Sequence, residues 1–281
     1  MIDLSRLFDP YARQARLFPG LLTIFPIILT AVAWFPELVT GSWGATLLTI
    51  STSCGLLYAL SVLSRSRGKV VERRLLKIWG GWPTTIWLRH RNPDLLGPVR
   101  LRYHEFLKNH VPNLVVPTRD EEEKDPANAD ASYASAVKWL QERCRGKTYP
   151  LVEKENAEYG FRRNLRGMKP IGIACCVVAV AVSILAIGLA HDGIASAIAS
   201  LSPVSILHAL VAVRPAAIGA TIVDIIAIFG WLFVVTDNWV RDAADQYARA
   251  LLANCDSMPT AKLKTPKAGG AKAPGTKSRR R

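Results

Sequence analysis

Hydrophobic and polar positions along this chain are separated into long blocks instead of alternating within short elements. Ile171 to Ala190 is twenty residues long without a charged side chain, which is the length that a helix needs to cross a hydrocarbon core of about 30 Å. Similar apolar blocks extend over Leu17 to Pro36, Leu38 to Ser64 and Ala216 to Val235. The pattern predicts an all-α integral membrane protein with about four transmembrane helices, of which the first two form a tight hairpin.

The block from Gly193 to Val213 is ambiguous. It is uncharged and about long enough to span a membrane, but Pro203 divides it, and several serines and His208 make it only moderately apolar. Its isoleucine and leucine side chains recur at helical spacing, so that one face is apolar. We interpret it as a non-cytoplasmic or re-entrant amphipathic segment between the last two spans.

The distribution of basic residues predicts the orientation. Lys and Arg number three in residues 1–16, twenty-two in 64–169 and ten in 237–281, whereas 191–215 contains only Arg214. Because short cytoplasmic loops hold the excess of Lys and Arg, four spans place every basic-rich segment on one side, and a fifth would separate the tail from the rest. The chain is therefore expected to be a multi-pass membrane protein with both termini in the cytoplasm.

These observations divide the chain into an N-terminal cytoplasmic segment, a transmembrane hairpin, a basic and mostly helical cytoplasmic insertion, a second pair of spans, a juxtamembrane helix and a disordered basic tail. The insertion has twenty-two basic and thirteen acidic residues, and the tail is composed mainly of Lys, Pro, Gly, Ala and Arg. In order, the predicted boundaries are 1–16, 17–63, 64–170, 171–236 (including the amphipathic segment 191–215), 237–256 and 257–281.

Local signals predict short helices at the start of the insertion. A helix that leaves the membrane is expected to end at Gly80 and Gly81, ahead of Pro83. Thr84 and Thr85 are expected to cap a second short helix.

The rest of the insertion contains a polar stretch followed by an amphipathic one. Residues 117–132 are rich in Asp, Glu, Pro and Ala, and we interpret them as a mobile spacer. Ala134 to Arg145 has the periodicity of one amphipathic helix. After the fourth span, another amphipathic helix is predicted from one apolar face: Trp239, Ala243, Tyr247 and Leu251.

Asp224 is the single carboxylate within the predicted fourth span. A charged side chain at the bilayer centre costs about 3 kcal/mol on insertion scales, so it normally faces a cavity or a polar partner. Asp224 could line a pore or relay protons. Alternatively, it forms a structural hydrogen bond to Thr221, to Thr23 or Thr30 of the first span, or to another subunit.

A cluster of basic and aromatic side chains occupies the first part of the insertion. Guanidinium groups match phosphate oxygens and indoles can stack on bases, so a nucleotide or oligonucleotide is a chemically sensible ligand. The plainer interpretation is a positive surface with interfacial tryptophans that contact lipid headgroups. The residues proposed for ligand binding are Arg73, Arg74, Lys77, Trp82, Trp87, Arg89, His90 and Arg91.

A second basic run precedes the third span and contains Arg162, Arg163, Arg166 and Lys169. Headgroup anchoring is the plain interpretation. The alternative is coupling, in which a ligand or partner that binds these residues moves the third span. We therefore consider the three arginines as candidate gating residues, together with Asp224.

Catalytic and metal-binding signatures are not evident. The three histidines of the insertion lack metal-ligand spacing, the five cysteines form no CxxC pair, and no nucleophile elbow, HExxH motif or EF-hand loop occurs. We therefore expect no enzyme activity, no catalytic residues, no bound metal and no cofactor.

Four blocks of the sequence carry a resemblance to known proteins: DPYARQARLFPGLLTIFP, GGWPTTIWLRHR, YGFRRNLRGMKPIGI and NWVRDAADQYARALL. They resemble uncharacterised bacterial multi-pass membrane proteins associated with phage defence and mobile genomic regions. The architecture is also similar to membrane effectors of oligonucleotide-signalled defence, such as the channel component of the Hailong type. That resemblance implies an oligomeric pore controlled by a signal that a nucleotidyltransferase partner supplies.

Two hypotheses of different classes follow. The first is a homo-oligomeric, ligand-controlled ion channel of antiviral defence, whose basic insertion binds a nucleotide-type signal and whose Asp224 helix lines the pore. The second is a non-conducting membrane-anchored scaffold that recruits a cytoplasmic partner. A small transporter is a weaker third hypothesis, because the chain lacks the internal repeat of many transporters.

Overall fold

The computed structural model describes residues 9–37, 41, 44–47, 49, 55–146, 148–190 and 214–258. Every regular element in these ranges is helical, which confirms the all-α prediction. The helices are α2 (Pro10–Ala12), η1 (Arg13–Leu17), α3 (Phe18–Trp34), α6 (Leu56–Trp79), α7 (Pro83–Ile86), α8 (Gly97–His110), α9 (Arg119–Lys124), α10 (Pro126–Arg143), α11 (Pro150–Ala190), α14 (Pro215–Phe229), η2 (Gly230–Val234), α15 (Asp237–Leu252) and α16 (Asn254–Ser257).

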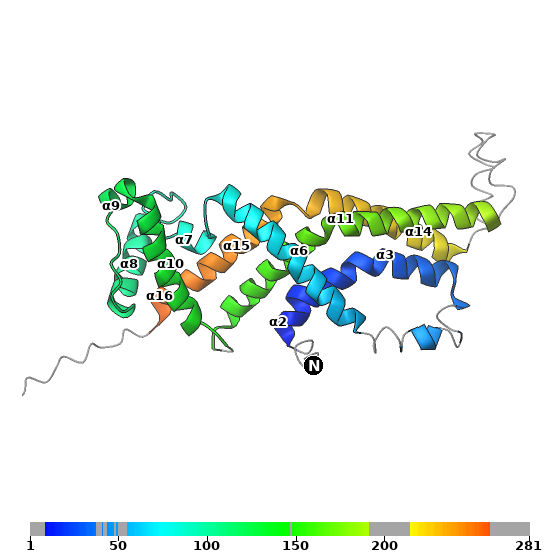
Figure 1. Ribbon diagram of the computed structural model, residues 1–281, viewed down its shortest axis with the longest axis horizontal. Coiled ribbons are helices and arrows are strands. Elements are labelled where there is room, and N and C mark those ends of the chain that lie inside the picture. Colours follow the sequence, from blue (N-terminus) through cyan, green and yellow to red (C-terminus); the bar gives the residue numbers. More distant parts are fainter. Residues whose placement is uncertain are drawn as a thin grey trace, which may run out of the picture.

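Three helical stretches of the described residues are long and apolar enough to cross a membrane: Pro10–Trp34, Pro150–Leu189 and Pro215–Val234. Many of their outward side chains are large and apolar, such as Ile184 and Phe233, which are 63% and 71% exposed. Exposed apolar surface of this extent belongs against lipid and not water. These three helices therefore indicate a membrane protein. Figure 1 shows α3, α14 and the end of α11 lying together in what we call the membrane half (α3, residues 170–190, α14 and η2).

The predicted second span, Leu38 to Ser64, is not among these three. Eleven residues of the 38–64 block lie outside the described residues, namely 38–40, 42, 43, 48 and 50–54, as do the whole 193–213 segment and the 259–281 tail. The described end of that block is the beginning of α6, which continues without interruption past Ser64 into the basic sequence as far as Trp79.

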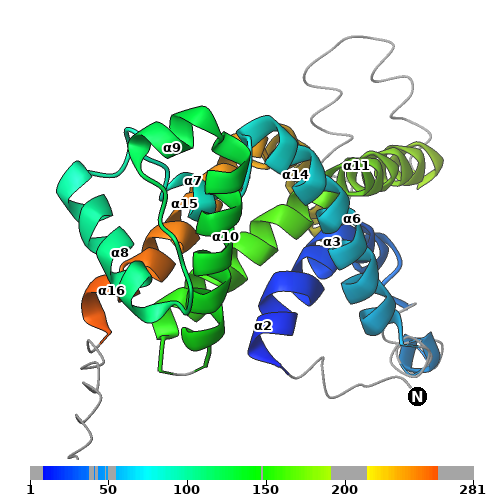
Figure 2. The ribbon, with the colours of Figure 1, turned by 60° about the vertical axis from the view of Figure 1, so that its left-hand side comes forward.

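The other half of the molecule, which we call the polar half, consists of α7 to α10, the start of α11, α15 and α16 (Figures 1 and 2). Its core is formed by side chains from all the longer helices of this half, including Leu88, Leu107, Leu140 and Leu251, which are almost completely buried. The amphipathic face predicted for the juxtamembrane helix is turned inward along its length. Leu251 is buried in this core with Tyr247 packed against it, whereas Ala243 is buried against α6 and α11, and Trp239 packs against a separate cluster nearer the membrane half.

The interpretation of residues 117–132 as a mobile spacer is wrong. They form α9 and the first part of α10, and Glu122 and Ala129 are buried. Thr118 and Glu121 form a reciprocal capping box, and Asp125 caps α10 ahead of Pro126. The acidic residues therefore start helices, where carboxylates favour the helix dipole, instead of marking a solvated loop.

The prediction for Thr84 and Thr85 also needs correction. Gly80 ends α6 in the left-handed region at φ 73°, as the sequence indicates, but the next helix already begins at Pro83. Thr84 and Thr85 lie buried within α7, and neither is its N-cap residue. Proline at the first helical position explains the earlier start.

One helix joins the two halves. α11 has 41 residues and is about 60 Å long at 1.5 Å per residue. It begins in the polar core and ends in the membrane half, and α6 crosses it between the two (Figures 1 and 2). The crossing is very close: a Cβ on Gly167 would lie 2.5 Å from the Arg67 backbone, and a Cβ on Gly68 would collide with Asn164. Only glycine fits at either position.

We predict that Gly167→Ala destabilises the protein, because the atoms that its methyl group would meet are backbone and cannot rotate away. Overpacking of this kind costs about 1–3 kcal/mol. Gly188→Ala is the matched control in the same helix, since its Cβ would meet no atom within 4 Å. Thermal unfolding in mild detergent should show a lower midpoint for Gly167→Ala and an unchanged or higher one for Gly188→Ala. Equal midpoints would contradict the close crossing.

Candidate functional site

The charged residues where α11 enters the membrane half form a continuous cluster, which we call the collar. It joins α6 and α11 to the bend between η2 and α15. Its members are Glu72, Arg74, Arg162, Arg163, Arg166, Lys169 and Asp237.

The centre of the collar is the buried ion pair between Glu72 of α6 and Arg163 of α11. Tyr159 donates a hydrogen bond to Glu72 over 3.2 Å, and Lys69 binds the second carboxylate oxygen. Burial raises the pKa of Glu72, but Arg163 and Lys69 outweigh it and hold that pKa below the usual glutamate value. Since Arg163 also donates to Asn164, whose side chain donates to the Ala15 carbonyl over 2.6 Å, this pair fixes α6, α11 and η1 together.

The second part of the collar holds the bend that leads out of the membrane half. Asp237 accepts hydrogen bonds from Arg74 over 2.6 Å and from Arg166 over 2.8 Å. Lys169 donates to the carbonyls of Leu232 and Val235, both over 3.0 Å. A cation at the C-terminal end of a helix satisfies open carbonyls and favours the helix dipole. The end of η2 and the start of α15 are thus both fastened to α11.

Arg162 completes this arrangement. It pairs with Glu158 over 2.7 Å, donates to the Trp239 carbonyl over 3.1 Å, and lies 4.9 Å from the centre of the Trp239 ring. Each predicted gating arginine therefore has an intramolecular partner. This geometry fits coupling between helices better than headgroup anchoring alone.

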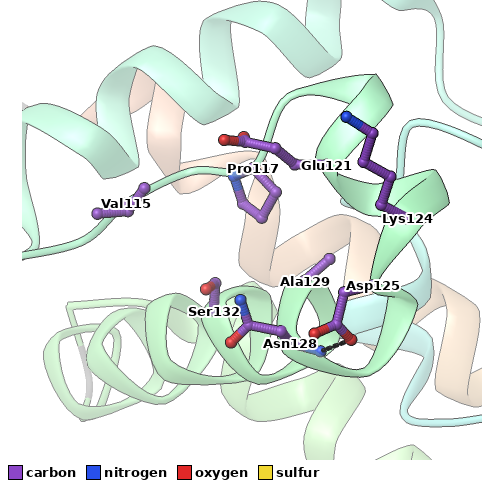
Figure 3. Close-up of a pocket in the computed structure, with 8 residues that line it drawn as sticks. All are labelled: Val115, Pro117, Glu121, Lys124, Asp125, Asn128, Ala129 and Ser132. Atoms are coloured by element: carbon purple, nitrogen blue, oxygen red, sulfur yellow. Dashed lines mark hydrogen bonds between the residues drawn. The ribbon is translucent and has the colours of Figure 1, made fainter.

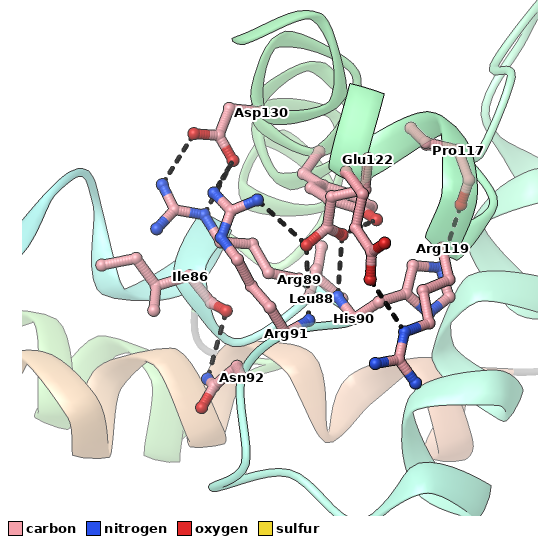
Figure 4. A network of polar contacts seen from close by, with 12 residues as sticks. Ile86, Leu88, Arg89, His90, Arg91, Asn92, Pro117, Arg119, Glu122 and Asp130 are labelled. Atoms are coloured by element: carbon pink, nitrogen blue, oxygen red, sulfur yellow. Dashed lines mark hydrogen bonds and ion pairs between the residues drawn. The ribbon is translucent and has the colours of Figure 1, made fainter. Parts of the chain in front are cut away.

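The predicted ligand-binding cluster is divided by the fold. Arg89 is buried and makes a two-pronged contact with Asp130, both bonds being 2.7 Å (Figure 4). It also donates a hydrogen bond to the Gly80 carbonyl. Trp87 is buried and donates to Asp245 over 3.0 Å. Both side chains hold the polar half together, so neither presents a free surface to a ligand.

Glu122 is the partner that sequence reasoning missed. It is buried and accepts hydrogen bonds from the His90 amide and the Tyr133 hydroxyl, both over 2.8 Å, and it pairs with Arg91 over 3.1 Å (Figure 4). The Glu122 carboxylate thereby anchors the chain at residues 90–91 to α9 and α10. The capping box at Thr118 was the sequence signal that could have placed it in a helix.

Five members of the predicted cluster are exposed, but two of them, Arg74 and Arg91, are held in ion pairs with Asp237 and Glu122. Arg73 and Lys77 are exposed and make no ion pair within the described residues, and Trp82 is 44% exposed. The nearby Trp79 is covered by Arg241, whose guanidinium lies 5.0 Å from the ring centre. The accessible basic and aromatic surface is thus much smaller than the sequence suggested.

Asp224 is completely buried between two membrane helices. It accepts a 2.6 Å hydrogen bond from Thr30, which joins α14 to α3. Three threonines were considered as partners of Asp224, and Thr30 of the first span is the one that binds it. Thr221 and Thr23 instead donate to carbonyls of their own helices. The other carboxylate oxygen, Oδ1, has no hydrogen-bond partner within the described part of the chain.

A further cavity of about 270 Å³ lies between α9 and α10, and Figure 3 shows the side chains around it. Its two carboxylates, Glu121 and Asp125, already accept hydrogen bonds as helix caps. Within the described residues, no group of three or more His, Cys, Asp or Glu side chains is placed to hold a metal ion. We therefore assign no chemistry to this cavity.

Comparisons with protein-family models, with curated proteins and with solved structures find no match to this chain.

We predict that Arg89→Ala destabilises the fold, because it leaves the Gly80 carbonyl without this donor and the Asp130 carboxylate with only the longer, 3.8 Å contact to Arg91. Breaking a buried pair in this way costs about 3–5 kcal/mol. Lys77→Ala, which removes an exposed cation, is the matched control. Chemical denaturation followed by tryptophan fluorescence should separate the two variants. If Arg89→Ala unfolds at the wild-type midpoint, Arg89 is free for a ligand after all.

We also predict that acid weakens the polar half through His104. Its ring is buried beside His90, Arg100, Glu122 and Tyr133, and burial lowers its pKa from 6.5 to about 4. A group whose pKa is lower in the folded than in the unfolded protein contributes its full stabilisation above the unfolded pKa. For His104 this contribution is lost as the pH falls from 6.5 to 4, and it amounts to about 3 kcal/mol of unfolding free energy.

The measurement is the unfolding midpoint between pH 7 and pH 5. It should fall more steeply for the wild type than for His104→Gln, which can keep the hydrogen bond to the Leu88 carbonyl without titrating. Parallel curves for the two proteins would exclude His104 as the titrating group.

Proposed function

We propose that the chain is a multi-pass effector of the bacterial inner membrane, in which the polar half receives a cytoplasmic signal and controls a pore formed by several subunits. The observation that supports this most is the continuity of α11, which begins in the polar core and ends in the membrane half. A displacement of the polar half would be passed along this helix, which continues through Pro170 where it enters the membrane half. The collar would pass the same movement to α6 and to the end of η2.

The membrane half supports an oligomeric pore over a monomeric one. Three spans pack around the Asp224–Thr30 bond, and much of their outer surface consists of exposed apolar side chains. Three helices rarely enclose a conduction path. Several subunits would therefore associate through their apolar outer faces. A shift of α11 against α14 would then expose or rearrange Asp224, whose Oδ1 atom lacks a partner within the described residues.

For the signal, the accessible remainder of the basic cluster is the best candidate surface. Arg73 and Lys77 offer cations to phosphate groups, and Trp82 offers a ring for stacking. A nucleotide or oligonucleotide supplied by a nucleotidyltransferase partner fits this chemistry. In this arrangement both termini and the polar half lie in the cytoplasm, where the positive-inside rule places basic segments.

A scaffold function is the second candidate, and a specific observation favours it. Leu96, Leu101 and Val115 are 72%, 63% and 74% exposed on the polar half. Exposed apolar side chains of this kind suit the docking of a cytoplasmic protein. A scaffold of this type would recruit a partner to the membrane and conduct nothing.

The test is ion flux from liposomes that contain the purified full-length protein and entrapped K⁺. We would measure efflux without addition, with ATP, and with a 5′-phosphorylated trinucleotide. The proposal predicts K⁺ efflux above that of empty liposomes. It also predicts that efflux differs between the arms with and without an added nucleotide, and that the double variant Arg73→Ala, Lys77→Ala abolishes this difference. Asp224→Asn should change the efflux in every arm.

An Arg119→Ala variant is the control, because that side chain is highly exposed on α9 and pairs only with Glu123 within the described residues. Efflux equal to that of empty liposomes in all arms would overturn the pore and favour the scaffold. Efflux that is identical in all arms would overturn the proposed signal.

A further inference from the structure

Two adjoining cavities form one trough along the first membrane helix. The first is about 490 Å³ in volume and lies beside Arg13, Gln14 and Phe18, and the second is about 480 Å³ and lies beside Leu22 and Pro26. Phe161 of α11 lines both. The lining residues 14, 18, 22 and 26 follow each other at intervals of four, so they form one stripe along η1 and α3.

The second part of the trough is almost wholly apolar. Its other wall is formed by α14 and η2, including Ala227 and Gly230, and its floor by Leu165. It extends along that wall from Val223 to Val235, which is about 18 Å of helix. This length is close to one leaflet of the bilayer, whose hydrocarbon core is about 30 Å thick in both leaflets together.

The first part of the trough contains its charged side chains, Arg13 and Glu158, and we call it the polar part; it lies at the level of the collar. Arg13 is exposed there and makes no ion pair within the described residues. The one carboxylate that lines it, Glu158, is already paired with Arg162, and the nearby Asp9 caps α2. Within the described part of the chain, Arg13 is thus a cation that is available to an anion. Trp239 lies at the adjoining end of the apolar part, a position typical of tryptophan at a membrane interface.

We propose that this trough binds one phospholipid with an anionic headgroup, with an acyl chain in the apolar part and the headgroup at Arg13. The match has two parts: an apolar channel of one leaflet's length, and a cation at the end where the headgroup of such a lipid would lie. The site does not depend on whether the protein conducts ions.

Two glycines of the same helix permit a matched test. Gly230 lines the trough and Gly219 does not, and a Cβ on either would meet no atom within 4 Å. Gly230→Leu therefore fills the trough without forcing the helices apart, and Gly219→Leu adds the same side chain elsewhere on α14. For the headgroup, Arg13→Gln is compared with Arg119→Gln in the polar half.

The experiment is native mass spectrometry of the full-length protein released from detergent, after incubation with equal amounts of phosphatidylglycerol and phosphatidylcholine of the same chain length. We expect one bound lipid, with phosphatidylglycerol preferred about fivefold, the effect of one basic side chain near an anionic headgroup. Arg13→Gln should lose that preference but retain lipid, and Gly230→Leu should lose lipid of both kinds. The variants Arg119→Gln and Gly219→Leu should behave as the wild type.

Three outcomes would overturn the proposal. Equal binding of both lipids by the wild type would remove the role of Arg13. Equal loss in the Gly219→Leu and Gly230→Leu variants would show that the trough is not the site. Absence of any retained lipid would mean that another occupant, such as a further segment of this chain, fills it.

Discussion

The crossing of α6 over α11 is the contact on which the rest of the structure depends. Gly68 and Gly167 bring the two backbones so close that no side chain fits between them. This proximity puts Glu72 within reach of Arg163 in a buried pair, although the desolvation of two charges is costly and must be recovered by good geometry and further hydrogen bonds. Tyr159, Lys69 and Asn164 provide those bonds. A larger residue at either glycine would therefore disturb both the packing and the electrostatics of the collar.

The collar also explains how a membrane half and a polar half act as one body. Besides α6, which leads to α7, two chain segments connect them: the continuous α11 and the bend between η2 and α15. The basic residues of α11 fasten that bend to α11. The polar half contributes its own rigid contacts, because Arg89 and Glu122 tie the 80–91 segment to α9 and α10. Basic side chains that would suit phosphate binding in isolation are used here to hold helices together.

The sequence was sufficient to predict most of the helices, but it was insufficient to predict which side chains pair between them. Twenty-residue apolar blocks and the Gly80 terminator predict helices because their signals are local. The Asp224 bond to Thr30 was among the stated alternatives, but nothing in the sequence chose between three threonines. Arg89 and Asp130 are forty-one positions apart, and a pairing of that kind depends on the packing of α10 against α7. The acidic 117–132 stretch was misread because its overall polarity was given more weight than the capping signals of Thr118 and Asp125.

The collar and the trough meet at two residues, and this contact links lipid with helix arrangement. Arg162 pairs with Glu158, which lines the polar part of the trough, and lies over the ring of Trp239, which lines the apolar part. The far end of the trough is bounded by Pro26 and Val223, and the latter adjoins Asp224 in the chain. A lipid seated in this position would contact α3, α11 and α14 at once. Its presence would therefore favour the helix arrangement in which the Asp224–Thr30 bond is closed.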